Sequence, residues 1–411
     1  MICTAKLENF TASRKMRTYL RFLPIYSLHV LLAAPVEEFD LRVEGVFLVS
    51  VAVKDSLAAV ETLILDTGSR HTWIYHNDEL KRIHRKQKMP EDALGGFRTN
   101  RVGKSSKADA REIHYADSNM IICDRWTRKE FAIGSHKWGQ KFGIARGNEK
   151  ERAPLYSGLI GASPGSHFAT LHPQFGFRPV DSHAMKLFFG PIDPAQCEGG
   201  KVGYMPLSDD HHWTTRGSID FGGHVSLPHV NMAVDTGASV FAFPRRLFNI
   251  FQAGVKSLGI RYQYLPDKLS GLVDCRDVSR LPPFEISTSN GSKITIPYQL
   301  YVKKVGGTIC ILLVASIADS LPVVLGRPVT VNFLTQFDSA NRRIGICKPV
   351  GSKFDGQIIE DVPMRGPVPP EITQPRRVPD EVEEGPFDVL SSSSLSFNFA
   401  LMVVVSIISC I

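Results

Sequence analysis

The chain is a succession of short apolar segments separated by turn residues, with few long amphipathic patterns. Three examples are KITIPYQLYVKK (residues 293–304), TICILLVASI (308–317) and RIGICKPV (343–350). They alternate or run apolar over strand-like lengths, and they lie between Gly, Pro and Asn residues that favour turns. This pattern predicts a mainly β protein.

Two of the apolar runs lead into the same tripeptide, Asp-Thr-Gly. The first is TLILDTGSRHTW, which contains Asp66, and the second is NMAVDTGASVFAFP, which contains Asp235. Residues 63–65 and 232–234 predict short strands buried on both faces, so each Asp would enter the protein interior. Burial of a lone carboxylate is costly, which favours a functional pair over two turn formers that cap strands.

A second repeat follows each tripeptide at nearly the same distance along the chain. SGLIGASPG contains Gly161, and PVVLGRPVT contains Gly326. Because the same two motifs recur in the same order, the sequence predicts two similar lobes. With 411 residues, of which 43% are hydrophobic, the chain can bury two cores.

The net charge of +7 is concentrated partly in KRIHRKQK (residues 81–88). A nucleic-acid site would need neighbouring aromatic residues or a recognition helix, and neither pattern is present, so no nucleic-acid partner is expected. The segment is interpreted as a solvated loop that biases the protein toward acidic substrates or polyanions. The pI is near 9.0.

Other common chemistries lack their motifs in this sequence. The 13 His residues show no HExxH pattern and no paired metal-ligand spacing, and DDHHW (residues 209–213) is interpreted as a polar turn. A Gly-rich phosphate loop and a GxSxG motif are also missing. We therefore expect no metal and no cofactor.

The order of the motifs resembles the pepsin family of aspartic proteases over residues 43 to 348. Trp73 stands where the family's DTGSSxxW motif has Trp, and IHYADS places Tyr115 in the flap hairpin. KLFFGPIDPAQCEGGKVGYMPL resembles the crossover between lobes, and QFDSANRRIGIC resembles the last core strands. The resemblance implies a bilobal, pepsin-like β fold, with one catalytic Asp from each lobe and the active-site cleft between the lobes.

The resemblance assigns Asp66 and Asp235 as the catalytic pair and gives their neighbours supporting roles. Two adjacent carboxylates share one proton, and the aspartic proteases are the standard example of this effect. Gly68 and Gly237 allow the two turns to approach closely. The other supporting residues are expected to form hydrogen bonds: the hydroxyls of Thr67 and Thr236 to the opposite turn, and that of Ser69 to Asp66.

Tyr115 and Trp73 are expected to form the substrate-binding flap contact, and the alternative is a pair of core aromatics. Several positions depart from the family pattern: Ala116 and Ser118 at the flap tip, Ser157, Arg327 and Ala238. Ala238 stands where many members have Ser or Thr, so Asp235 lacks a hydroxyl donor and its pKa should lie higher.

Cysteine and glycosylation assignments depend on a secreted location. The resemblance pairs Cys275 with Cys310 and leaves Cys123, Cys197 and Cys347 unassigned. Asn290 begins an Asn-Gly-Ser sequon and is a candidate glycosylation site.

The ends of the chain indicate membrane targeting. Residues 1–34 resemble a signal peptide, and a membrane anchor is the alternative. Residues 35–195 and 196–350 are predicted as the N-terminal and C-terminal catalytic lobes, 351–393 as a Pro-rich charged linker and 394–411 as a hydrophobic tail. This tail resembles a GPI signal, with a retained transmembrane end as the rival interpretation.

These observations predict an aspartic endopeptidase in the secretory pathway. We expect a monomer that cleaves polypeptide substrates and that is secreted or is associated with the cell surface or a membrane through its tail or a lipid anchor. The alternative is a catalytically weak homologue that acts as a peptide-binding surface protein. The intact Asp-Thr-Gly turns favour the enzyme, whereas the altered flap favours the peptide-binding protein.

Overall fold

The structure is a computed structural model that describes most of the two predicted lobes. The described residues are 37–43, 46–56, 58–87, 111–115, 120–146, 156–181, 184–265, 270–288, 291, 293–306, 308–351 and 358–359. The signal-like segment, the hydrophobic tail, nearly all of the linker, Asn290 and the flap-tip residues Ala116 and Ser118 lie outside these residues. No helix in the described part is long and apolar enough to span a membrane.

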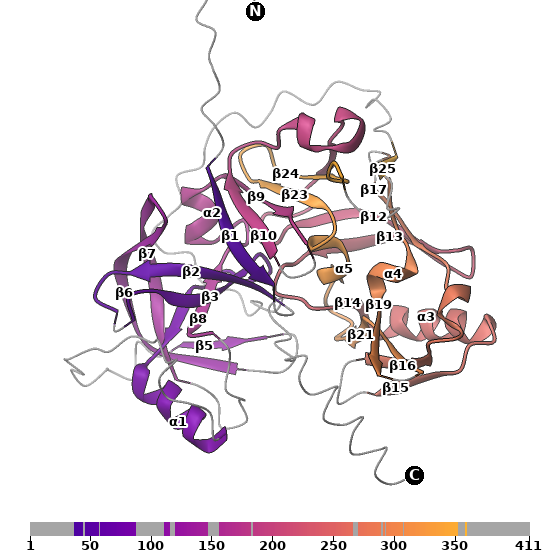
Figure 1. Ribbon diagram of the computed structural model, residues 1–411, viewed down its shortest axis with the longest axis horizontal. Helices are drawn as coiled ribbons and strands as arrows, with labels where there is room; N and C mark the ends of the chain where they lie inside the picture. Colours follow the sequence, from indigo (N-terminus) through magenta and orange to yellow (C-terminus); the bar gives the residue numbers. More distant parts are fainter. Residues whose placement is uncertain are drawn as a thin grey trace, which may run out of the picture. The chain divides into compact units, whose positions relative to one another are not determined.

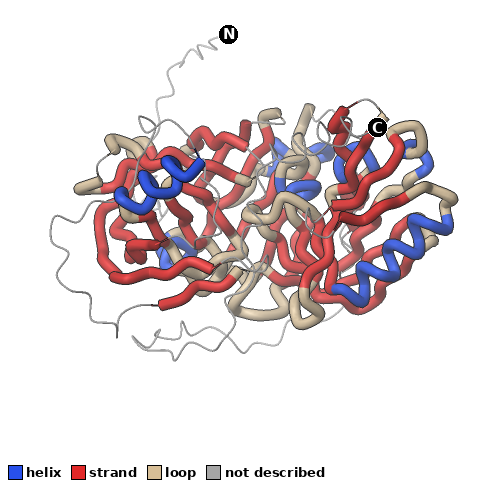
Figure 2. The backbone as a smooth tube through the Cα atoms, turned by 90° about the horizontal axis from the view of Figure 1, so that it is seen from below, coloured by secondary structure: helices blue, strands red, loops and turns tan. Residues whose placement is uncertain are grey.

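Strands dominate the described residues, which confirms the predicted mainly β fold (Figures 1 and 2). The largest sheet has the order β11(Gly203–Pro206), β24(Arg343–Cys347), β23(Leu334–Asp338), β9(Gln174–Pro179), β10(Ala184–Phe189), β1(Glu38–Val43), β2(Phe47–Val53), β3(Glu61–Asp66), β8(Gly158–Gly161), β4(Trp73–Tyr75), β7(His136–Arg146), β6(Met120–Ile133) and β5(Arg111–His114).

Two further sheets belong to the second half of the chain. One has the order β21(Val314–Ile317), β14(Phe241–Pro244), β22(Val323–Leu325), β13(Val225–Val234), β12(Thr214–Phe221), β17(Phe284–Thr288), β18(Lys293–Ile296) and β25(Ile358–Ile359). The other has the order β15(Tyr262–Leu265), β16(Ser270–Asp274), β20(Ile309–Leu312) and β19(Val302–Gly306). The α-helices are α1(Asn77–Gln87), α2(His167–Leu171), α3(Arg245–Ser257), α4(Tyr298–Tyr301) and α5(Arg327–Thr330).

The two copies of the sequence motif adopt the same arrangement of strands. In the first copy β3 pairs in parallel with β8, and β8 pairs antiparallel with β4. In the second copy β13 pairs in parallel with β22, and β22 pairs antiparallel with β14. Each Asp-Thr-Gly turn therefore follows a strand that is paired with the strand of the second repeat, which confirms the two similar lobes.

Strands from both predicted lobes share one sheet. The neighbouring strands β23 and β9 come from opposite sides of the predicted lobe boundary between residues 195 and 196. The position of this boundary remains a prediction. Trp213 is buried at this junction, and its Nε1 donates to the carbonyl of Ala162 at 2.8 Å. Phe337 packs on Trp213 with a centroid distance of 5.0 Å. The two halves thus share a continuous core.

The predicted solvated loop at residues 81–88 is wrong, because most of it belongs to helix α1. Leu80 and Ile83 are buried against the core that contains Trp73 and Tyr115. Positions three apart lie on one face of a helix, so two apolar residues suffice to dock it. The prediction of a loop was wrong because the many basic residues made the short apolar face of the helix hard to recognise in the sequence.

One smaller expectation about strands also differs from the structure. The apolar run at residues 293–304 is interrupted by the single helical turn α4, which follows Pro297. Proline favours the first turn of a helix and cannot donate to a sheet, which explains the interruption.

Two disulfides are present among the described residues. The predicted pair of Cys275 and Cys310 is confirmed, and Cys197 also pairs with Cys347. This second bridge was left open by the sequence, since nothing in the local pattern relates two residues 150 positions apart. Cys123 is a buried free thiol.

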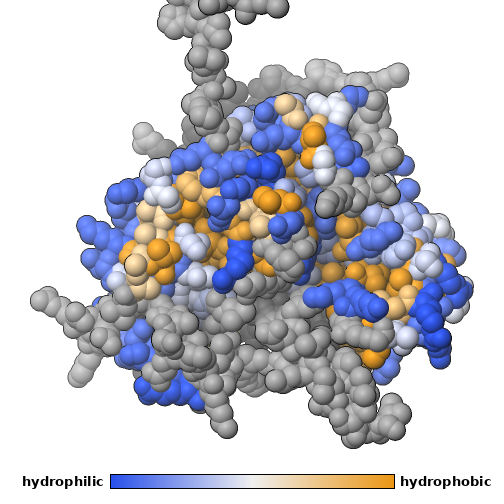
Figure 3. Space-filling view, in the orientation of Figure 1, coloured by the Kyte–Doolittle hydropathy of each residue, from blue (hydrophilic) through white to orange (hydrophobic). Residues whose placement is uncertain are grey.

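Few large apolar side chains are well exposed among the described residues. On the face in Figure 3, hydrophilic side chains lie along the margins, with apolar side chains between them. The large apolar side chains that are well exposed among the described residues are scattered over different elements: Val60, Leu171, Val180, Ile250 and Val350. Scattered exposure of this kind is normal for a folded surface and marks no docking face.

Candidate active site

The two Asp-Thr-Gly turns meet in the interior. Asp66 ends β3 and has 0% of its surface exposed, and Asp235 directly follows β13 and has 2% exposed. The side chains form a hydrogen bond with each other. The structure thus brings together the two carboxylates that the sequence pattern singled out.

The threonines of the two turns connect them symmetrically. The backbone N–H of Thr67 donates to the Thr236 hydroxyl, and the N–H of Thr236 donates to the Thr67 hydroxyl, each at 3.0 Å. The Thr67 hydroxyl donates to Val234 O at 3.1 Å, and the Thr236 hydroxyl donates to Leu65 O at 2.7 Å. The hydrogen bonds expected between opposite turns are therefore present, and all four are buried.

Gly237 explains how the turns come so close. A Cβ atom at Gly237 would lie 2.6 Å from both Cγ and Oδ1 of Asp66, which is shorter than any tolerable contact. The N–H of Gly237 donates to Asp235 Oδ1, and the N–H of Gly68 donates to Asp66 Oδ1, both at 2.8 Å. Glycine is thus required at position 237 because the opposite carboxylate occupies the space of a side chain.

The two carboxyl groups differ in their environment. Burial raises the pKa of Asp66 to about 6, although the Ser69 hydroxyl, which donates to Asp66 Oδ2 at 2.7 Å, opposes this rise. Burial raises the pKa of Asp235 well above its usual range, and the nearby charge of Asp66 raises it further. Ala238 offers no hydroxyl to Asp235. The negative charge is therefore favoured on Asp66 and the shared proton on Asp235.

Ala238 has a packing role as well. It belongs to a small cluster with Ala233, Ala242 and Val324. Its carbonyl accepts a hydrogen bond from the backbone N–H of Arg327 at 2.8 Å. Arg327 thus supports the turn through its main chain, and burial lowers the pKa of its guanidinium.

Trp73 and Tyr115 contact each other beside the first turn. Both are buried, and the indole N–H of Trp73 donates to the Tyr115 hydroxyl. Tyr115 follows β5, which forms a hairpin with β6. The contact expected from the resemblance is present, and burial raises the pKa of the Tyr115 phenol well above its usual range.

The departure at Ser157 coincides with a feature that the sequence reasoning missed. Glu61 is completely buried at the start of β3. Ser157 donates to its Oε2 at 2.5 Å, and the Ser56 hydroxyl donates to its Oε1. The carboxyl group that many family members place at position 157 is thus supplied from the neighbouring strand. Only the pairing of strands shows that Glu61 lies beside Ser157. The linear sequence does not relate these two residues.

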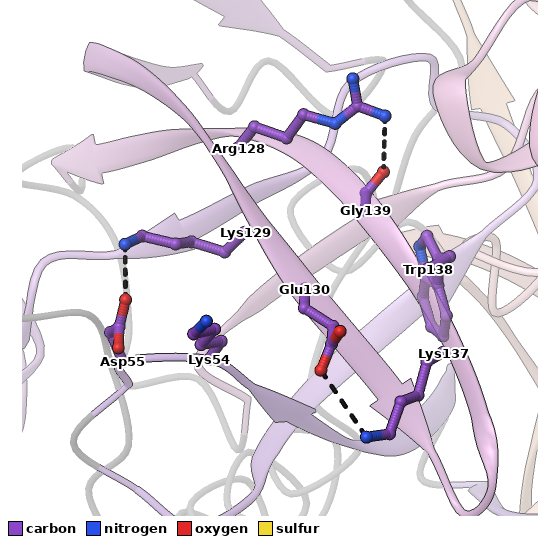
Figure 4. Close-up of a pocket in the computed structure, with 8 residues that line it drawn as sticks. All are labelled: Lys54, Asp55, Arg128, Lys129, Glu130, Lys137, Trp138 and Gly139. Carbon is purple, nitrogen blue, oxygen red and sulfur yellow. Dashed lines mark hydrogen bonds and ion pairs between the residues drawn. The ribbon is translucent and has the colours of Figure 1, made fainter.

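A pocket of about 600 Å³ is lined by residues of the first lobe (Figure 4). Its lining is mainly charged: Lys54, Asp55, Arg128, Lys129, Glu130, Lys137, Trp138 and Gly139. Lys129 pairs with Asp55 at 2.6 Å and Lys137 with Glu130 at 3.8 Å. The pocket contains none of the predicted site residues.

The duplicated turns and the buried carboxylate pair define the two-lobed class of pepsin-like folds. The family model of the eukaryotic aspartyl proteases matches residues 175–349, which confirms the family resemblance. The matched segment contains Asp235 and the second turn. No curated protein sequence matches the chain.

We predict that Thr67→Val will destabilise the protein by about 2–4 kcal/mol, because Val234 O and the N–H of Thr236 both lose a buried partner. The free energy of unfolding in urea measures this change. Thr170→Val is the matched control, since its exposed hydroxyl donates to a backbone carbonyl within one helix. A loss no larger than that of the control would contradict the role of the paired turns.

Proposed function

We propose that the protein is an aspartic endopeptidase in which Asp66 acts as the base and Asp235 as the acid. The observation that carries this proposal is the hydrogen bond between the two buried carboxyl groups, whose pKa values are raised to different extents. The match to the aspartyl protease family supports the class of reaction.

The proposed reaction requires one proton on the pair. The Asp66 carboxylate removes a proton from a water molecule as its oxygen attacks the peptide carbonyl carbon, while Asp235 gives its proton to the carbonyl oxygen. The resulting gem-diol collapses when Asp66 gives its proton to the amide nitrogen, Asp235 takes a proton from a gem-diol hydroxyl, and the C–N bond breaks. The pair then returns to its original state, with one proton.

The neighbouring residues prepare the pair for this step. Backbone N–H groups of Gly68 and Gly237 hold one oxygen of each carboxyl group, and Ser69 holds the second oxygen of Asp66. Because these donors are fixed before substrate binds, little reorganisation is needed when charge moves during the reaction. We propose that Tyr115, which lies next to the turn of the β5–β6 hairpin, covers a bound peptide.

We predict that Asp66→Asn and Asp235→Asn will each lower kcat/KM for peptide cleavage by about 10²–10⁴-fold or more, because each removes one partner of the proton transfer. Cleavage of a mixed peptide library measures the loss, and melting temperatures check the fold. Asp193→Asn is the control, since Asn can also cap the short helix that Asp193 begins.

Near wild-type cleavage by either variant would contradict dyad catalysis. A wild-type chain that binds peptides without cleaving them would instead support the peptide-binding homologue.

The pH dependence follows from the two environments. Activity needs Asp66 ionised and Asp235 protonated, so kcat/KM should fall as the pH drops below about 6, the pKa of Asp66. Ser69→Ala removes a donor to the charged form of Asp66 and raises its pKa. We predict that the acid limb of the profile will move to higher pH by a fraction of a unit to about one unit.

The control for this profile is Ser208→Ala. The Ser208 hydroxyl donates to the backbone carbonyl of Thr214, so this variant also loses one hydroxyl hydrogen bond. An acid limb that stays in place or moves to lower pH in Ser69→Ala would contradict the assignment of Asp66 as the ionised member.

We also propose that the protein enters the secretory pathway and is held at a membrane by a lipid that replaces residues beyond Ser391–Ser394. The support is compositional: small residues, a short polar spacer and an apolar tail, FALMVVVSIISCI. Phosphatidylinositol-specific phospholipase C should then release the protein from membranes. Detection of the intact SIISCI peptide in the membrane-bound form would show a retained tail instead.

A further inference from the structure

A group of basic side chains begins at the first Asp-Thr-Gly turn. Arg70 follows Ser69, which holds Asp66, and the N–H of Ser163 donates to Ser69 O at 2.9 Å. The Arg70 side chain extends over the loop after β8. A Cβ atom at Gly165 would lie 3.6 Å from its Nε and 3.9 Å from its Cζ. A partly exposed guanidinium therefore lies beside the turn that carries Asp66.

The strands β6 and β7 bring two further cations to the same place. His71, the residue after Arg70, packs edge-on against Trp126 with a centroid distance of 5.4 Å. Lys141 Nζ lies 6.0 Å from the centroid of Trp126. Arg128 stands directly opposite Lys141 in the register of the two strands. Lys141 thus lies beside the ring of Trp126, as does Arg111, which is 5.9 Å from the ring centroid, and Arg128 lies opposite Lys141 on the neighbouring strand.

His167 is a further basic residue near Arg128 and Lys141. It begins α2, two residues after Gly165, over which Arg70 lies. Burial lowers the pKa of His167, and the positive charges of Arg128 and Lys141 lower it further. We call Arg70, Trp126, Arg128, Lys141 and His167 the basic patch.

The basic patch has a surplus of donors. Among the described residues, Arg70, Arg128 and Lys141 form no ion pair with a carboxylate, and Arg128 contacts only the carbonyl of Gly139, at 3.5 Å (Figure 4). Two cations directly opposite each other on neighbouring strands destabilise a sheet. The indole N–H of Trp126 and the Nδ1 of His167 are buried without a hydrogen-bond partner in this part of the chain.

The nearby carboxylates are already engaged. Asp124 pairs with Arg146 at 2.8 Å, and Glu130 pairs with Lys137 at 3.8 Å. The basic patch therefore lacks acceptors, and a ligand that supplies negatively charged oxygen atoms would satisfy it.

We propose that the basic patch binds an acidic side chain of the polypeptide substrate, so that the enzyme prefers substrates with Asp or Glu close to the cleaved bond. This inference rests on the proposed endopeptidase function. Arg70 is the member nearest to Asp66 along the chain and is the residue that determines the preference. Arg128 and Lys141 extend the positive potential away from the carboxylate pair.

The test uses one cleaved peptide in which a single Glu is moved through four positions on each side of the scissile bond, with Gln at the same position as the reference. We expect Glu to raise kcat/KM about 3- to 10-fold over Gln at one or more positions, since the contact is partly exposed to solvent. The ratio should fall with added salt.

Arg70→Gln should bring the Glu-to-Gln ratio close to one, and Arg70→Glu should make Lys preferred over Gln at the same position. The double variant Arg128→Gln with Lys141→Gln should lower the ratio in part. Because both of these side chains are exposed, the double variant tests the patch even if Arg70 variants fold poorly. Arg245→Gln, which removes an exposed arginine at the start of α3, should keep the wild-type ratio.

The outcomes separate the two proposals. Cleavage with a ratio near one at every position would overturn the basic patch and leave the endopeptidase intact. A preference for Glu that survives both Arg70→Gln and the double variant would overturn it as well. A wild-type chain that cleaves no peptide would contradict the proposed function and this inference with it.

Discussion

The contact between two buried carboxyl groups is the constraint on which the rest of the structure depends. Asp66 and Asp235 cannot both be ionised cheaply at this depth, so the pair is stable only when one proton is shared and every remaining oxygen is hydrogen-bonded. The paired threonines hold the two turns at this distance, and Gly237 leaves room for the opposite carboxylate. The parallel pairs of β3 with β8 and of β13 with β22 present the turns from the interior of their sheets.

The asymmetry of the pair follows from a difference of one side chain. Ser69 donates to Asp66, whereas the equivalent position after the second turn is Ala238. A symmetric fold therefore holds an asymmetric charge, with the base in the first turn and the acid in the second. The basic patch begins at that same first turn, so Asp66 and Arg70, the residue proposed to determine the substrate preference, belong to one segment of the chain.

The sequence predicted the structure best where the same motif occurs twice. The duplicated turns predicted two similar lobes, and the hydrogen bonds expected for Thr67, Thr236 and Ser69 are present in the structure. It failed where packing decides the outcome. A short apolar face with only Leu80 and Ile83 was enough to turn a basic segment into α1. The Cys197–Cys347 bridge depends on contacts between distant strands that no local pattern records.

The same limit applies to the basic patch, since Arg70 is far in sequence from Arg128 and Lys141, and only the register of β6 and β7 places these two opposite each other. The proton shared by Asp66 and Asp235 can be observed directly. The most direct measurement is a pH titration of the aspartate carboxyl carbons by NMR, with Asp66→Asn and Asp235→Asn used to assign the two signals. We expect the Asp66 signal to titrate near pH 6 and Asp235 to remain protonated to higher pH. Two independent titrations near the usual aspartate pKa of about 3.9 would contradict this expectation.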